Sequence, residues 1–158
     1  MESLRPEMFP EKTCVISINE PESNDGDANL HPNWYKVFRI RFWDVTKRLE
    51  SGFVLAGHPA TAIDPMTEDQ AKELADFIKE NEDCTILVHC RAGISRSAAV
   101  ARFLMERGWA DISQYEGFIP PYITGRMPTE RTNVSRANIH VLSLLRHQFP
   151  DMLPEGAV

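Results

Sequence analysis

Hydrophobic positions change their spacing along the chain, and the change predicts strands that alternate with helices. Residues 13–18 form a short β-prone run. Residues 34–42 alternate, with Phe38, Ile40 and Phe42 on one face, and this period of two is typical of a strand. Residues 85–88 form a third, wholly apolar run whose composition is typical of a buried strand. The pattern therefore predicts at least three strands.

Three further segments have the longer period of a helix. Residues 67–80 place four apolar side chains on one face behind Thr67, a good N-cap residue. Residues 97–107 are apolar around much of the circumference and end before Gly108, while residues 136–147 carry a third apolar stripe. Because strands and helices interleave, we expect an α/β fold with a mainly parallel central sheet flanked by helices.

Length and composition indicate one globular domain. The chain has 158 residues, of which 42% are hydrophobic and 25% charged. We expect a flexible lead-in over residues 1–12, a single domain over residues 13–150 and a tail over residues 151–158. No apolar run is long enough to span a membrane, and the first residues lack the pattern of a signal peptide.

Charge and cysteine content exclude several classes of function. The net charge is −6, without a dense basic cluster, which argues against a nucleic-acid partner. The 3 cysteines have neither disulfide-framework nor metal-ligand spacing, so we expect no metal and no cofactor.

The most informative segment is residues 89–97, HCRAGISRS, between the third strand and the second helix. A strand, a tight loop and a helix in this order can form a nest of backbone N–H groups that holds an oxyanion. Gly93 supplies backbone freedom for the turn. Arg96 offers a planar fork that can bind two phosphate oxygens. We therefore expect phosphate or sulfate to bind in this loop.

Cys90 lies at the base of this predicted nest, where a helix N-terminus and nearby cations favour a thiolate. A thiolate facing a bound phosphoryl group is an activated nucleophile and would form a phosphocysteine. Ser97 can donate a hydrogen bond to the sulfur as it departs. His89 precedes the cysteine on a strand, so it should point away and support the loop.

At these residues the chain resembles the cysteine-dependent protein tyrosine phosphatase superfamily, and within it the small dual-specificity phosphatases. The family signature of His-Cys, five residues, Arg and Ser or Thr matches HCRAGISRS throughout, and a looser resemblance covers residues 13–149. It implies a tyrosine-phosphatase-like fold whose phosphate-binding loop joins a central strand to a helix. It also implies that the substrate phosphate is held by Arg91, Ala92, Gly93, Ile94, Ser95 and Arg96.

The resemblance also requires a general acid, and two aspartates are candidates. Asp44 directly follows the strand of residues 34–42, as the family's acid follows a strand. Its interval to Cys90 is longer than the family implies, which an insertion over residues 50–65 would explain. The interval from Asp64 is too short. We favour Asp44 and keep Asp64 as the alternative.

The resulting expectation is a phosphatase that acts on phosphotyrosine and on phosphoserine or phosphothreonine in proteins, or on small phosphomonoesters. Arg91 also suits multiply phosphorylated ligands such as phosphoinositides, which is one alternative. A non-catalytic phosphate-binding domain and a rhodanese-like or arsenate-reducing loop are two others. Because a working thiolate needs a reducing compartment, a cytoplasmic location is expected.

Overall fold

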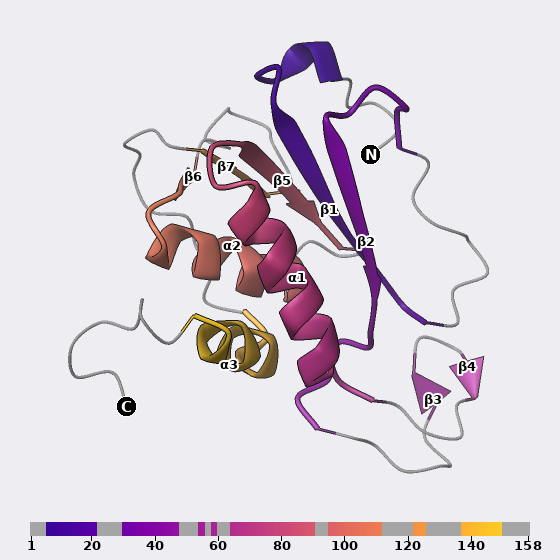
Figure 1. Cartoon of the computed structure of the whole chain (residues 1–158). Helices are drawn as coiled ribbons and strands as arrows, with labels where there is room; N and C mark the ends of the chain where they lie inside the picture. Colours follow the sequence, from indigo (N-terminus) through magenta and orange to yellow (C-terminus); the bar gives the residue numbers. More distant parts are fainter. Residues whose placement is uncertain are drawn as a thin grey trace.

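The fold is α/β, with three helices on one side of a sheet that contains three adjacent parallel strands (Figure 1). In this computed structural model the described residues are 6–21, 30–47, 54–55, 58–59, 64–90, 95–111, 122–125 and 137–149. The parallel strands are β1 (Thr13–Asn19), β2 (Lys36–Arg41) and β5 (Thr85–His89), and the helices are α1 (Glu68–Glu80), α2 (Arg96–Glu106) and α3 (Ile139–His147).

The sheet is mixed rather than mainly parallel, because two short strands extend it beyond β5. The strand order is β2-β1-β5-β7-β6, and β7 pairs antiparallel with both of its neighbours. The sequence pattern did not predict either strand, since each is too short to show a period. These strands are β6 (Ala110–Asp111) and β7 (Tyr122–Gly125).

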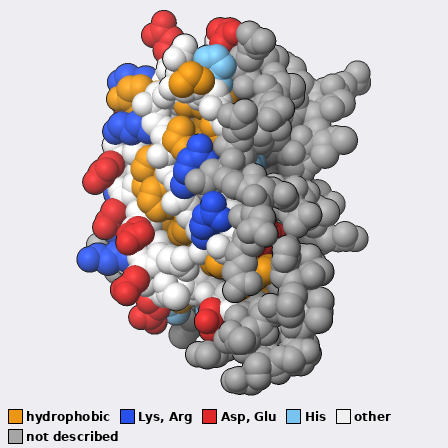
Figure 2. Space-filling view, turned by 90° about the vertical axis from the view of Figure 1, so that its right-hand side faces the viewer, with side chains coloured by type: hydrophobic (Ala, Val, Ile, Leu, Met, Phe, Trp, Pro, Cys, Tyr) orange, Lys and Arg blue, Asp and Glu red, His pale blue; other side chains and the backbone are white. Residues whose placement is uncertain are grey.

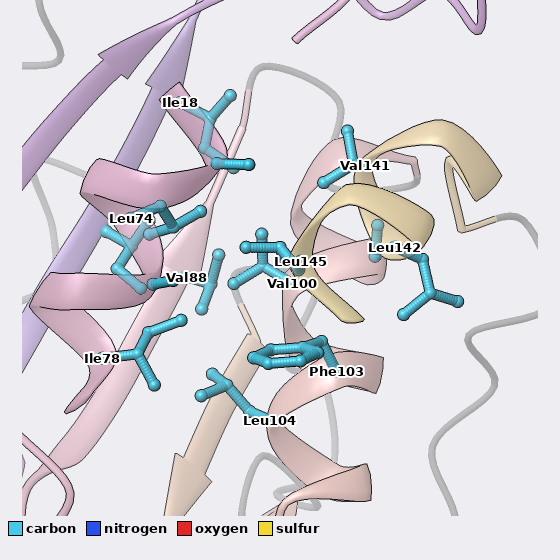
Figure 3. Close-up of a cluster of buried hydrophobic side chains, with 14 of the residues drawn as sticks. Ile18, Leu74, Ile78, Val88, Val100, Phe103, Leu104, Val141, Leu142 and Leu145 are labelled. Atoms are coloured by element: carbon cyan, nitrogen blue, oxygen red, sulfur yellow. The ribbon is translucent and has the colours of Figure 1, made fainter. Parts of the chain in front are cut away.

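Alternation along β1 and β5 directs their side chains to two separate hydrophobic clusters. Ile16 and Ile18 of β1 and Val88 of β5 point to the helices and join the main core. Figure 3 shows this core, where side chains from both strands and all three helices converge. Val15 and Leu87 point the other way and pack with three residues of the N-terminal half: Phe9, Leu30 and Trp34.

Helices α1 and α2 begin and end within one residue of their predicted bounds, whereas α3 begins at Ile139 rather than at residue 136, because Asn138 is its N-cap. Thr67 caps α1 through a reciprocal capping box with Gln70, with distances of 3.0 and 3.1 Å. The Gln70 side chain also donates to the carbonyl of Arg41, which joins α1 to the end of β2. Gly108, just after α2, has a φ of 99°, a left-handed conformation that glycine adopts without steric cost.

The segment between β2 and α1 contains a separate two-stranded antiparallel sheet. Its strands are β3 (Val54–Leu55) and β4 (His58–Pro59), and neither belongs to the main sheet. Figure 1 shows them away from the main sheet. They lie in the interval between Asp44 and α1, where the sequence analysis considered an insertion. Also near the N-terminus is a short 3-10 helix, Pro6–Met8.

Charge is unevenly distributed over the face that includes the β2 edge. Figure 2 shows acidic side chains along one margin and basic side chains beside hydrophobic ones nearer the centre. Exposed acidic residues of α1 include Glu73 and Asp76, whereas exposed residues of β2 include Lys36 and Arg39. Although the chain carries a net negative charge, β2, the strand before Asp44, therefore exposes basic side chains. Among the described residues, no helix has the length and hydrophobicity needed to cross a membrane.

Replacing the α1 cap tests how much this local signal contributes to stability. We expect Thr67→Ala to lower the free energy of unfolding by about 1 kcal/mol, because the backbone N–H of Gln70 loses its acceptor. Denaturant unfolding followed by circular dichroism measures the change. Glu73→Ala, at an exposed position of the same helix, is the matched control. An equal effect of the two substitutions would contradict the capping role.

Candidate phosphate-handling site

The cysteine and the serine of the signature motif lie side by side in the structure. Cys90 follows β5 directly, and Ser97 lies in the first turn of α2. The Cys90 Sγ and Ser97 Oγ atoms are 3.2 Å apart, and both residues are buried. The hydroxyl is therefore placed to donate to the sulfur. Residues 91–94, which include the predicted phosphate-binding residues Arg91, Ala92, Gly93 and Ile94, lie outside the described residues.

Arg96, the residue before Ser97, is a buried charged residue held by hydrogen bonds. It is only 4% exposed, and its guanidinium donates to the Phe42 carbonyl at 2.8 Å and to a Glu20 carboxylate oxygen at 2.7 Å. Its Nε is buried and, among the described residues, has no hydrogen-bond partner. A buried arginine held through its two terminal nitrogens has a fixed orientation. Among the described residues its Nε–H is therefore a donor that an oxyanion could accept from.

Glu20, which the sequence analysis missed, supplies the negative charge beside Arg96. It directly follows β1, and its backbone carbonyl accepts a hydrogen bond from the Arg41 side chain at 3.0 Å. The next bond along the chain, from the Phe42 N–H to the Asn19 carbonyl, keeps β1 and β2 together at this end. Parallel strands bring their carboxyl ends to one edge of a sheet. The sequence signal that could have identified Glu20 was therefore an acidic residue at the carboxyl end of a neighbouring strand.

Asp44 reaches the same region from the segment after β2. Its Oδ1 accepts hydrogen bonds from the Ser95 hydroxyl at 2.7 Å and from the Asn138 side-chain amide at 2.9 Å. Among the described residues no partner is seen for Oδ2. Ser95 occupies the N-cap position of α2. Its side chain makes no capping bond, because the hydroxyl donates to Asp44 instead. The first N–H groups of α2 are thus left without a side-chain cap from Ser95.

Asn138 is the second residue that the sequence analysis missed. This residue falls inside the predicted helix of residues 136–147, and no contact was predicted for it. In the structure Asn138 is 5% exposed and caps α3 by accepting from the N–H groups of His140 and Val141. Asparagine is a common N-cap residue, so sequence alone suggests capping but not the contact with Asp44.

A pocket of about 380 Å³ opens beside Asp44. Its walls are residues 44–47, Ser95 and residues 137–139. Asp64, the alternative acid, is exposed ahead of α1 and is not among the residues that line this pocket. Asp44, rather than Asp64, therefore lines the pocket together with Ser95, the residue that precedes Arg96.

His89 points to the opposite face of β5, as its strand position predicts. It pairs in register with Ser17, and it is 5% exposed. Burial, with a smaller contribution from the Arg39 charge, lowers the pKa of His89 to about 4. The imidazole is consequently neutral at pH 7. Its Nε2 has no hydrogen-bond partner in the described part of the chain, so the predicted support of the loop is not seen there.

The other two cysteines have a different environment from that of Cys90. All three are free, but Cys14 pairs in register with Ile86, four positions before Cys90 on β5. Burial and the neighbouring Cys84 raise the pKa of Cys14 to about 12, and burial is also the main cause of a raised pKa at Cys84. Cys14 is therefore a neutral thiol at pH 7. No group of metal-binding side chains occurs among the described residues.

Comparison with protein-family models, curated proteins and solved structures finds no match. Any assignment of function therefore depends on the motif and on the contacts of this chain.

The pKa of His89 predicts a specific dependence of stability on pH. In the unfolded chain His89 is protonated as the pH falls through about 6.5, whereas in the folded chain it is protonated only near pH 4. The contribution of this histidine to stability is therefore complete above pH 6.5 and is lost as the pH falls toward 4. We expect a loss of about 3 kcal/mol from this residue alone.

Unfolding free energies of wild type and His89→Gln between pH 7 and pH 4 measure this effect. The variant should show a loss smaller by about 3 kcal/mol, since glutamine has no proton to gain. His147→Gln, which replaces an exposed histidine of α3, controls for the substitution itself. Parallel curves for wild type and His89→Gln would refute the buried neutral histidine.

Proposed function

We propose that the protein is a cysteine-dependent phosphatase that hydrolyses phosphotyrosine, and also phosphoserine and phosphothreonine, through a phosphocysteine intermediate. The observation that carries this proposal is the arrangement at the start of α2. There the Cys90 sulfur contacts the Ser97 hydroxyl at 3.2 Å, and the adjacent Arg96 is buried and held in place. The tyrosine-phosphatase-like fold of the resembled family belongs to this proposal.

In the first step the Cys90 thiolate attacks phosphorus, and the bond from phosphorus to the leaving oxygen breaks. Asp44 gives its proton to that oxygen, so the product is a neutral alcohol or phenol. Arg96 and the backbone N–H groups of residues 91–96 hold the other phosphoryl oxygens. Arg96 is held in one orientation before any reaction, and donors oriented in advance are the largest source of electrostatic stabilisation in many enzymes.

In the second step water attacks the phosphocysteine and Asp44 takes the proton that it loses. The S–P bond breaks, inorganic phosphate leaves and the thiolate is restored. Ser97 stabilises the departing sulfur by donating its O–H, in line with the 3.2 Å contact. Arginine, the helix N-terminus and the nest neutralise the phosphoryl charge, so this chemistry needs neither a metal ion nor a cofactor.

The position of Asp44 favours turnover over a domain that only binds phosphate. An acid must be within reach of the leaving group, and Asp44 bonds to the residue directly before Arg96. A sulfurtransferase has no need of a proton donor there. Substrates are accordingly phosphorylated protein side chains or small phosphomonoesters. A phosphoinositide remains the alternative substrate, and it depends on Arg91.

Removing the nucleophile tests the reaction class. We expect Cys90→Ser to abolish hydrolysis of p-nitrophenyl phosphate, since a neutral hydroxyl is a far weaker nucleophile than a thiolate. The variant should still bind phosphate, measured by ³¹P NMR titration. Cys84→Ser, at the opposite end of β5, is the matched control and should retain turnover. Hydrolysis by Cys90→Ser at a rate near wild type would contradict the assignment.

Two substrates with different leaving groups identify the general acid. A phenolate needs the acid's proton far more than p-nitrophenolate, which is stable as an anion. Asp44→Asn should therefore lower kcat for phenyl phosphate by roughly 10²–10⁴-fold, with a much smaller loss for p-nitrophenyl phosphate. Asp64→Asn should match wild type on both substrates. If Asp64→Asn, and not Asp44→Asn, shows the selective loss, the acid has been assigned to the wrong residue.

A further inference from the structure

Asn138 connects three segments that are distant in the sequence and meet at Asp44. Its side-chain amide donates to Asp44 Oδ1 at 2.9 Å and to the Val45 carbonyl at 3.3 Å. Its backbone N–H donates to the Ser95 carbonyl at 3.0 Å. Its Oδ1 accepts from the N–H groups at the start of α3. Through its side chain and its backbone, this one buried residue thus contacts the segment after β2, Ser95 at the start of α2 and the N-terminus of α3.

We propose that Asn138 is a positioning residue for the general acid, an inference that rests on the proposed function. The amide holds Oδ1 of Asp44 while the Ser95 hydroxyl holds the same oxygen from the other side. Two donors at Oδ1 make that atom the acceptor oxygen of the carboxyl group. The proton that passes to the leaving group therefore resides on Oδ2.

The contacts of Asn138 also fix Asp44 relative to the phosphoryl group. Ser95 immediately precedes Arg96, whose guanidinium is held at the ends of β1 and β2. Because Asn138 bonds to both Ser95 and the Asp44–Val45 segment, it holds Asp44 beside the residue that precedes Arg96. Misplacement of a reacting group by about 1 Å can lower a rate by roughly 10²-fold.

The capping and positioning roles of Asn138 can be separated by substitution. Serine is also a good N-cap residue, but it has no amide to reach Asp44 or the Val45 carbonyl. Asn138→Ser should therefore keep α3 and lose the contact with the acid. Asn138→Asp keeps the size and the capping oxygen but replaces the donor by a second carboxylate. Ser143→Ala, at an exposed position of α3, is the control for changes in the helix.

We expect Asn138→Ser to lower kcat for phenyl phosphate by roughly 10²-fold, with KM and the p-nitrophenyl phosphate rate near wild type. In the Asp44→Asn background the same substitution should cause no further loss, because the group that it positions is already gone. Equal losses on both substrates, or additive losses in the double variant, would overturn the positioning role and leave the proposed phosphatase intact.

A second measurement does not depend on turnover. The side-chain amide resonances of Asn138 in ¹H–¹⁵N spectra should shift when Asp44→Asn removes the carboxylate, and should not shift with Asp64→Asn. If Asp44→Asn leaves them unchanged, the contact is absent in solution and the proposal fails. If wild type hydrolyses no phosphomonoester while these resonances respond as expected, the proposed function fails and the Asp44–Asn138 contact stands.

Discussion

The candidate site depends first on the buried bonds of Arg96. Its guanidinium joins α2 to the carboxyl ends of β1 and β2 through Glu20 and the Phe42 carbonyl. Removing one partner of a buried ion pair leaves an uncompensated charge, which typically costs about 3–5 kcal/mol. Arg96 and Glu20 therefore contribute to the stability of the fold, independently of any role in binding. The same bonds fix the guanidinium at the carboxyl ends of β1 and β2.

A second group of contacts is centred on Asp44 and uses the neutral side chains of neighbouring segments. Ser95 and Asn138 direct their donors to one oxygen of Asp44, and Asn138 also caps α3. Ser95 gives up the usual capping contact of its own helix for this purpose. A polar network is specific only when its members are satisfied together. Asp44, the start of α2 and α3 are accordingly one connected unit.

Much of the fold could be predicted because the relevant signals are local. Thr67 and Gln70 define the start of α1, and Gly108 follows the end of α2, through interactions within a few residues. Alternation in β1 and β5 separates the two hydrophobic clusters for the same reason. The strands β6 and β7 could not be predicted, because a strand of two to four residues is stabilised by its partners rather than by its own pattern.

By itself the sequence determined the α/β class, the order of a strand and a helix around residues 89–97 and the pairing of Cys90 with Ser97, which are 7 positions apart. The tertiary structure alone decided which acidic residue meets Arg96, which aspartate lines the pocket and what holds that aspartate. Glu20, Asp44 and Asn138 come from distant parts of the chain, and no spacing rule connects them. Their meeting follows from parallel strands that end at one edge and from a helix that packs against it, contacts that exist only after folding.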